Sequence, residues 1–270
     1  MATTLVKEYE LSVHQACEVA EVSRSVYYYQ KQDPQDWEVI ERLQELADRH
    51  PGYGFWKMYM LLRKRGYLWN HKRVYRIYTS LKMNLRRKRK RLLPKREKKP
   101  IVVPSALCHT WSIDFMMDRL YEGRPFKIMN ILDDYNREAL TMELDTSIGS
   151  LRVVRALESL KSDGLKPSII RVDNGTEFTS MNFVNWCTDN EVTIQYIQPG
   201  KPVQNAFIER FNGSYRREVL DRYAFTTMQE ARDITYEWMA HYNSERPHDS
   251  LGSLSPHEYH LQNSSYEHGL

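Results

Sequence analysis

The sequence predicts a mixed α/β domain that follows an all-helical, basic region. Up to about residue 92, apolar residues recur at the i, i+3, i+4, i+7 spacing of amphipathic helices. After Pro104 the pattern changes to short apolar and aromatic runs that are typical of strands. Residues 51–100 hold 18 of the 39 Lys and Arg residues and one acidic residue, a net charge of +17. Such a basic block beside a second domain favours a module that binds a polyanion.

Two short helices are expected between residues 11 and 30. Ala16 and Cys17 share one helical face in the first, and Ser23 is a suitable N-cap for the second. The pattern is that of a helix-turn-helix, although a plain helical hairpin explains it equally well. We therefore treat residues 1–34 as a helix-turn-helix-like segment.

Three further amphipathic helices are expected in residues 35–92. One covers residues 36–48, one runs from Phe55 to Gly66, and one is capped by Asn70. Cations on the last helix lie off its apolar stripe, and the run RRKRKRLLPKREKKP follows soon after it. This segment should bind phosphates with little sequence preference and a steep salt dependence. The DNA-binding residues expected here are Lys72, Arg73, Arg76, Arg86, Arg87, Lys88 and Arg89. Residues 93–104 would form a basic linker.

Five strands and three helices are expected in residues 105–225, followed by a C-terminal helical extension in residues 226–270. The strand patterns are CHTWSIDFMMD, FKIMNILDDY, EALTMELD, SIIRVD and VTIQYI. Three strands followed by alternating helices and strands are typical of a mixed α/β domain. The first helix would bury the face that begins with Leu151. The three helices are expected over residues 151–160, 178–189 and 203–220.

Acidic residues occur in several of these strands. Asp173 ends the fourth strand within RVDNGTEF, and the Asn174-Gly175 pair after it is an ordinary turn signal. Most acids near strand ends are solvated, so this position alone assigns no chemistry. The other acids of the strand patterns considered are Asp114, Asp118, Asp133 and Asp134.

The helix over residues 203–220 carries a polar stripe around Glu209. At about 100° per residue, Asn205, Asn212 and Arg216 lie within about 60° of Glu209 on this helix. Glu209 is the only acid of the stripe, and amide and guanidinium groups flank it. This arrangement suits a carboxylate that holds a metal beside a cation that binds a phosphate.

The set Asp114, Asp173 and Glu209, with Arg216 seven positions after Glu209, resembles the DDE signature of retroviral-type integrases and insertion-sequence transposases. The blocks WSIDF, DDYNRE, VDNGTEF, QPGKPVQNAFIERFNGSYRREVL and YNSERPHDSLGSLSP resemble successive blocks of IS-three family transposases, encoded by the second reading frame. HPGYGFWKMYMLLRKRGYLWNHKRVYRIY is similar to the DNA-binding segment before their catalytic core. The resemblance covers the chain from about residue 11 to about residue 260.

The resemblance implies an RNase H-like core, which is a five-stranded mixed sheet with flanking helices, after an all-helical DNA-binding region. It implies a transposase that cleaves DNA at the ends of an insertion sequence and then transfers the 3′-hydroxyl strand. Asp114, Asp173 and Glu209 map onto the catalytic and metal-binding positions. Asp118, Asp133 and Asp134 do not, and we expect structural or surface roles for them; Glu177 would start a helix.

The expected cofactor is Mg²⁺ or Mn²⁺, two ions per active site. Three converging carboxylates repel one another, and oxygen-only ligands favour these hard cations. The residues expected to hold DNA beside the site are Lys201, Gln204, Asn205 and Arg216. Arg246 and His248 could either stabilise a turn or contact DNA. Structural zinc is not expected, because the sequence lacks the His-His-Cys-Cys module of retroviral integrases.

The expected partners are double-stranded DNA, at the element ends and the target, and further copies of the chain on that DNA. The product of the upstream reading frame is a further candidate. No apolar run approaches the roughly 18 residues of a membrane span, and no signal peptide is evident, so we expect a bacterial cytoplasmic, nucleoid-associated protein. Two alternatives stay open: a catalytically inactive DNA-binding regulator, and an RNase H-like nuclease or resolvase that cuts without joining.

Overall fold

The computed structural model describes residues 1–28, 35–85, 103–198 and 205–267, and the chain divides into two compact units, residues 1–41 and 42–270. The first unit contains the two helices expected between residues 11 and 30, and a further helix before them. Ser12 caps the second helix through a reciprocal pair of hydrogen bonds with Gln15. These helices are α1 (Ala2–Glu8), α2 (Val13–Val19) and α3 (Arg24–Tyr28).

The boundary between the units falls within α4 (Trp37–Arg49), which is followed by α5 (Phe55–Lys64) and α6 (His71–Ser80). These helices confirm the expected pattern. The Asn70 side chain accepts a hydrogen bond from the Lys72 backbone N–H at 2.9 Å, as an N-cap should. The faces predicted from the apolar spacing are buried in α5 and α6.

The sheet is five-stranded and mixed, as predicted. Its strands are β1 (Thr110–Arg119), β2 (Pro125–Asp133), β3 (Ala139–Asp145), β4 (Ile169–Val172) and β5 (Thr193–Tyr196). Their spatial order is β3-β2-β1-β4-β5, with β1 antiparallel to β2 and parallel to β4. β2 pairs antiparallel with β3, and β4 pairs parallel with β5. The strand that carries Asp114 is therefore central.

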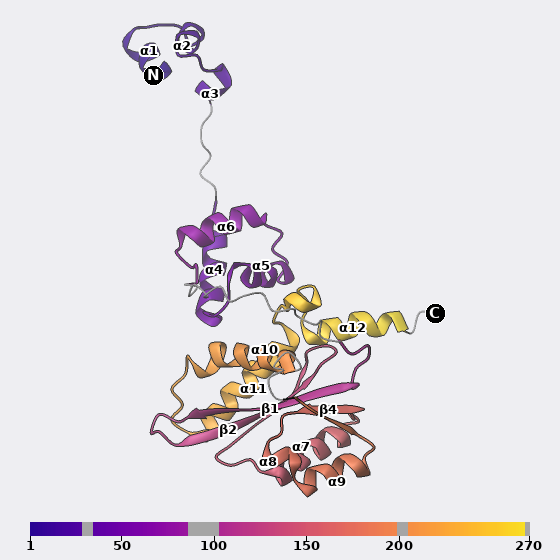
Figure 1. Cartoon of the computed structure of the whole chain (residues 1–270). Helices are drawn as coiled ribbons and strands as arrows, with labels where there is room; N and C mark the ends of the chain where they lie inside the picture. The colour runs from indigo at the N-terminus through magenta and orange to yellow at the C-terminus, as the bar shows by residue number, and fades with distance from the viewer. Residues whose placement is uncertain (29–34, 86–102, 199–204, 268–270) are drawn as a thin grey trace. The chain divides into compact units, whose positions relative to one another are not determined.

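Helices cover both faces of the sheet (Figure 1). One face packs against α7 (Ser150–Ser162), α8 (Thr176–Thr179) and α9 (Met181–Asp189). The other packs against α10 (Ala206–Tyr215), the π-helix η2 (Arg216–Leu220) and α11 (Met228–Ser244). The short 3₁₀ helix η3 (Asp249–Leu251) and α12 (Pro256–Glu267) follow.

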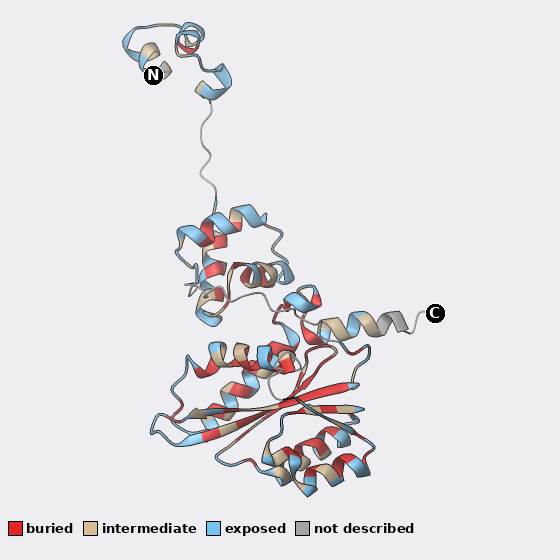
Figure 2. Cartoon of the chain, in the orientation of Figure 1, coloured by how far each residue is buried: buried red, intermediate tan, exposed pale blue. Residues whose placement is uncertain are grey.

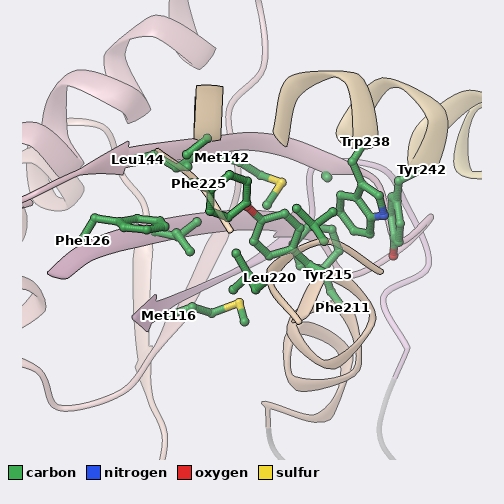
Figure 3. Close-up of a cluster of buried hydrophobic side chains, with 14 of the residues drawn as sticks. Met116, Phe126, Met142, Leu144, Phe211, Tyr215, Leu220, Phe225, Trp238 and Tyr242 are labelled. Atoms are coloured by element: carbon green, nitrogen blue, oxygen red, sulfur yellow. The ribbon is translucent and has the colours of Figure 1, made fainter. Parts of the chain in front are cut away.

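Successive strand residues point to opposite faces of the sheet, and each face contributes side chains to its own hydrophobic core. In Figure 2 the buried residues lie between the sheet and the helices on each face. Figure 3 shows the core between the sheet and helices α10 and α11. Phe126, Met142 and Leu144 of the strands lie around Phe225, and Tyr215, Trp238 and Tyr242 of the helices extend the same cluster. This core fixes α10 over β1 and β2, and so fixes the backbone that carries Glu209.

Three details of the predicted helices were wrong. The helix expected over residues 178–189 is two helices, because Ser180 is extended at φ −70° and ψ 148° and its side chain caps α9. Within the described part of the helix expected over residues 203–220, Ala206–Tyr215 is α-helical and Arg216–Leu220 forms the π-helix η2. On α7 the buried face centres on Val153 and Leu157, whereas Leu151 is 59% exposed.

Among the ranges that the structure describes, no helix is both long enough and apolar enough to cross a membrane.

Candidate active site

Asp114 is half-buried in the middle of β1, and an amide chain fixes its carboxylate. The Asn212 side-chain nitrogen donates to Asp114 Oδ2 at 2.8 Å. The Asn130 side-chain nitrogen donates to Asn212 Oδ1 at 2.7 Å, and Asn130 is the residue that pairs with Asp114 across β1 and β2. Both amides are buried, so α10 is tied to the sheet at the position of Asp114.

Asp173 is exposed directly after β4, in a tight turn. The parallel pairing ends with Ser112 beside Arg171, so two more residues of the same register bring Asp173 alongside Asp114. Asp173 Oδ1 accepts from the Gly175 backbone N–H at 2.9 Å. A Cβ at Gly175 would lie 2.9 Å from that oxygen, so a side chain there would displace the Asp173 carboxylate from its present position.

Glu209 is exposed in the first turn of α10. It precedes Asn212 by three residues, and residues at this spacing are neighbours on a helix surface. Because Asn212 is bonded to Asp114, the same side of α10 brings Glu209 near Asp114. The helix begins only after the end of β5, so α10 supplies the third acid from a separate part of the chain.

The pKa of Asp114 is affected by both of the other acids. Burial is the main cause that raises the pKa of Asp114 to about 6. The negative charges of Asp173 and Glu209 raise this pKa as well, whereas the hydrogen bond from Asn212 lowers it. Asp173 and Glu209 therefore each lie within electrostatic range of Asp114.

Asp114, Asp173 and Glu209 offer only carboxylate oxygens, which are the ligands that hard divalent cations prefer. Across residues 1–28, 35–85, 103–198 and 205–267, no three acidic, His or Cys side chains are close enough together to hold a metal ion.

The residues expected to contact DNA differ in their surroundings. On α6, Lys72 and Arg76 are exposed and Arg73 is partly buried. Asn205 is 6% exposed at the start of α10, so its side chain is not presented to solvent. Arg216 donates to the Met117 carbonyl at 2.8 Å. The residues that lie outside the described part of the chain are Arg86, Arg87, Lys88, Arg89, Lys201 and Gln204.

The acids assigned structural or surface roles have protein partners. Asp133 accepts from the backbone N–H groups of Cys108 and Tyr135, at 2.7 and 2.8 Å. The other pairs join Asp134 to Ser112 Oγ at 2.7 Å and to Arg171 at 2.5 Å, Asp118 to Arg216 at 3.8 Å, and Glu177 of α8 to Lys127 at 2.9 Å.

Arg246 and His248 are buried, which favours the structural alternative for both. Arg246 donates to both carboxylate oxygens of Glu218, at 3.2 and 2.8 Å. His248 packs edge-on against Tyr242, with ring centroids 4.6 Å apart. Sequence reasoning missed the roles of Asn130 and Glu218. Their partners lie in distant segments, and no local spacing indicates them.

Comparisons with known proteins agree with this geometry. Two family models, each described as an integrase core domain, match residues 106–202 and 190–256, and a third, described as an HTH-like domain, matches residues 34–91. The insertion element IS407 uncharacterized 31.7 kDa protein of Burkholderia multivorans is 39% identical over 250 residues, which are 92% of this chain and 90% of that protein. The chain belongs to the IS-three family of DDE transposases.

Another similar protein is the transposase InsD for insertion element IS2D of Escherichia coli (strain K12), 26% identical over 83% of this chain and 78% of that protein. The integrase-like fold is shared with a chain of the simian T-cell lymphotropic virus intasome, at a TM-score of 0.50 and 14% identity over 81% of this chain and 74% of that chain. The predicted RNase H-like fold is confirmed. This IS-three family member is an insertion-sequence transposase with a DDE polynucleotidyl transferase core.

Proposed function

We propose that Asp114, Asp173 and Glu209 are the catalytic carboxylates with which this transposase cuts DNA at the element ends and transfers the 3′-hydroxyl strand. The observation that carries the proposal is the hydrogen bond that ties α10 to β1: Asn212 donates to Asp114 at 2.8 Å, and Glu209 lies three residues before Asn212 on the same helix. The parallel register of β1 and β4 brings Asp173 alongside Asp114 as well. The negative charges of Asp173 and Glu209 both raise the pKa of Asp114, as expected for acids gathered at a site that has a chemical task.

Mg²⁺ or Mn²⁺, two ions per site, would be held by the same three carboxylates. When bound, the ions stabilise the attacking and leaving oxygens of a phosphodiester in an in-line displacement. The chain's own task is to hold the carboxylates in place. Asn212 orients Asp114, and the turn at Gly175 orients Asp173.

The DNA partner follows from the integrase core and the HTH-like domain. We propose that the basic residues of α6 and of the following segment contact the DNA backbone, together with Arg216, Lys201 and Gln204. The expected contact through Asn205 is withdrawn, because that side chain is buried. Synapsis of two element ends would require further copies of the chain, and the upstream-frame product remains a candidate partner. We also propose that the chain divides into five regions, with boundaries after residues 34, 92, 104 and 225. The proposed location of the protein is the bacterial cytoplasm, in association with the nucleoid.

The deciding experiment incubates the purified chain with a labelled duplex that carries the element end, with Mg²⁺. Asp173→Asn should lower both nicked and joined products by roughly 10³-fold, because it removes a charge worth several kcal/mol to the transition state. DNA binding should stay nearly unchanged. Asp163→Asn, at the exposed end of α7, is the matched control and should keep full activity.

Each alternative function predicts a different product pattern. Nicks without joined strands from the unmodified chain would indicate a nuclease or resolvase, and binding without either product would indicate an inactive regulator. Strand transfer by Asp173→Asn at the unmodified rate would show that the site assignment is wrong.

A further inference from the structure

A cavity of about 350 Å³, which we name the basic groove, runs along α10 on a different side from Glu209. Its walls come mainly from α10 and the segment that follows α11. Single residues come from η2, α11, α5 and the connection between β2 and β3. On a helix, Arg210 points about 100° away from Glu209, so the groove borders the candidate active site without being part of it. The charged residues that line the groove are Lys57, Arg137, Arg210, Arg217, Arg246 and Asp249.

Protein carboxylates neutralise only part of this positive charge. Glu218 lies 2.8 Å from Arg246 and 3.7 Å from Lys57, so it serves both of these cations. Arg210 and Arg217 are exposed, and the described part of the chain provides no ion pair for either. The groove therefore carries an excess of positive charge at these two guanidinium groups.

The local backbone is arranged to seat Arg217. Gly213 has no side chain, and a Cβ there would lie 3.1 Å from Arg217 Nη1. Arg217 Nη2 is 3.5 Å from Ser214 Oγ, and Arg246 Nη2 donates to the same oxygen at 3.2 Å. Two guanidinium groups thus converge on one hydroxyl. Like charges at such a separation repel each other, and an anion between them would relieve the repulsion.

We propose that the basic groove binds backbone phosphates of the DNA strand that passes the candidate active site. The inference rests on the proposed function for the identity of that strand. Guanidinium groups match phosphate oxygens in a bidentate geometry. Arg210 of α10 and Arg217 of η2 lie seven residues apart, roughly 10 Å along the helix axis, so the two guanidinium groups are far enough apart to contact different phosphates of one strand. Contacts of this kind fix the register of DNA on the protein and carry no sequence information.

The test measures binding of a fluorescent duplex to the full chain by polarisation, without divalent cations, over a series of KCl concentrations. Arg210→Ala/Arg217→Ala should lower the slope of log Kd against log[KCl] by about 1–2, since each lost phosphate contact contributes about 0.9. Arg210→Lys/Arg217→Lys keeps both charges and should retain the slope. Arg155→Ala/Lys161→Ala, two exposed cations of α7 on the other face of the sheet, is the matched control and should retain it too.

If the double alanine variant keeps both its salt slope and its unfolding temperature, the proposal that the basic groove binds DNA phosphates is wrong. An equal fall in the α7 control also overturns it, because general charge would then explain the result. The strand-transfer assay on the unmodified chain separates the two proposals. If the chain cuts and joins but the slope is unchanged, the groove fails alone. If the slope falls but no product forms, the groove stands and the proposed chemistry fails.

Discussion

At the scale of single residues, the amide of Asn212 joins the candidate active site to the body of the protein. It donates to Asp114 and accepts from Asn130, at 2.8 and 2.7 Å. Buried hydrogen-bond chains of this kind hold a ligand side chain in one orientation, and their loss weakens the site more than the stability of the fold. Asn212 is thus a positioning residue, while Asp114 is a candidate to touch the reacting atoms.

Asn212→Ala should lower the strand-transfer rate by roughly 10–100-fold, because Asp114 would lose its orienting donor. The free energy of unfolding should fall by only about 1–3 kcal/mol, the cost of leaving the buried Asn130 amide unpaired. Single-turnover rates and urea titrations measure the two effects. The control is Asn182→Ala, an exposed amide of α9. A transfer rate equal to that of the control would remove Asn212 from the site.

The sequence predicted the three acids of the candidate site because their spacing and neighbouring motifs are local patterns. It also placed Asn212 on the stripe of Glu209, but it could not predict that this side chain is buried. The partner amide, Asn130, lies 82 residues earlier in the chain. Only the packing of α10 on β2 brings the two together, and no periodicity in either segment encodes that contact.

At the scale of elements, Glu218 and Arg246 connect η2 to the segment after α11. Trp238 of α11 donates its ring N–H to Glu218 at 3.1 Å, and Lys57 lies 3.7 Å from the same carboxylate. The pKa of Glu218 is held below its usual range by Arg246, although burial acts in the opposite direction and is the largest single influence. The group is therefore ionised and needs its partners.

Arg246→Met should lower the free energy of unfolding by about 3 kcal/mol, because the buried charge of Glu218 would lose its bidentate partner and keep only Lys57, 3.7 Å away, as a counter-charge. Glu218→Leu should cost a similar amount. The double variant should lose clearly less than the sum of the two, since neither charge is then stranded. Urea unfolding of all four proteins completes the cycle. Strictly additive losses would mean that the two side chains do not act as a pair.

The elements were predictable where a strong periodicity exists, and their details were not. The break at Ser180 depends on one serine that caps α9 after an extended residue, within a segment of helical pattern. On α7 the buried face includes Ala156, a small residue that gives little periodic signal, whereas Leu151 is exposed. The π-helical turn of η2 has no signature in the sequence that we could recognise.

At the scale of the whole molecule, two sets of buried groups give opposite pH dependences of stability. Burial lowers the pKa of His50 to about 4 and of His248 to about 3, from the ordinary 6.5. Their contribution is present above pH 6.5 and is lost as the pH falls, because the unfolded chain then binds protons that the folded chain excludes. Burial raises the pKa of Asp114 and Asp133 to about 6, so their contribution is present below pH 3.8 and is lost as the pH rises through 6.

His248→Phe should remove the contribution of His248 to the pH dependence of stability, because it keeps a ring against Tyr242 and removes the titrating imidazole. Relative to the unmodified chain, the variant should gain roughly 2 kcal/mol in the free energy of unfolding between pH 8 and pH 5. Urea titrations at the two pH values in EDTA measure this difference. A difference that stays constant with pH would mean that the pKa of His248 is the same in the folded and unfolded chains.

The whole-molecule organisation was the part best predicted from sequence. The basic helical region, the change of pattern after Pro104 and the five strands all correspond to described elements. The mixed character of the sheet was implied by the family resemblance. The order β3-β2-β1-β4-β5 was not predicted, because the strand runs alone do not specify which strands become neighbours.

The central place of β1 has a consequence for the newly made chain. Its neighbour β2 follows almost at once, but β4 begins only at residue 169, long after β1 ends at residue 119. Until those later residues leave the ribosome, β1 has one open edge, and unpaired apolar edges recruit other chains into aggregates. Translation that stops before Ile169 therefore yields an incomplete, aggregation-prone sheet. The cell's proteases would need to degrade such a fragment.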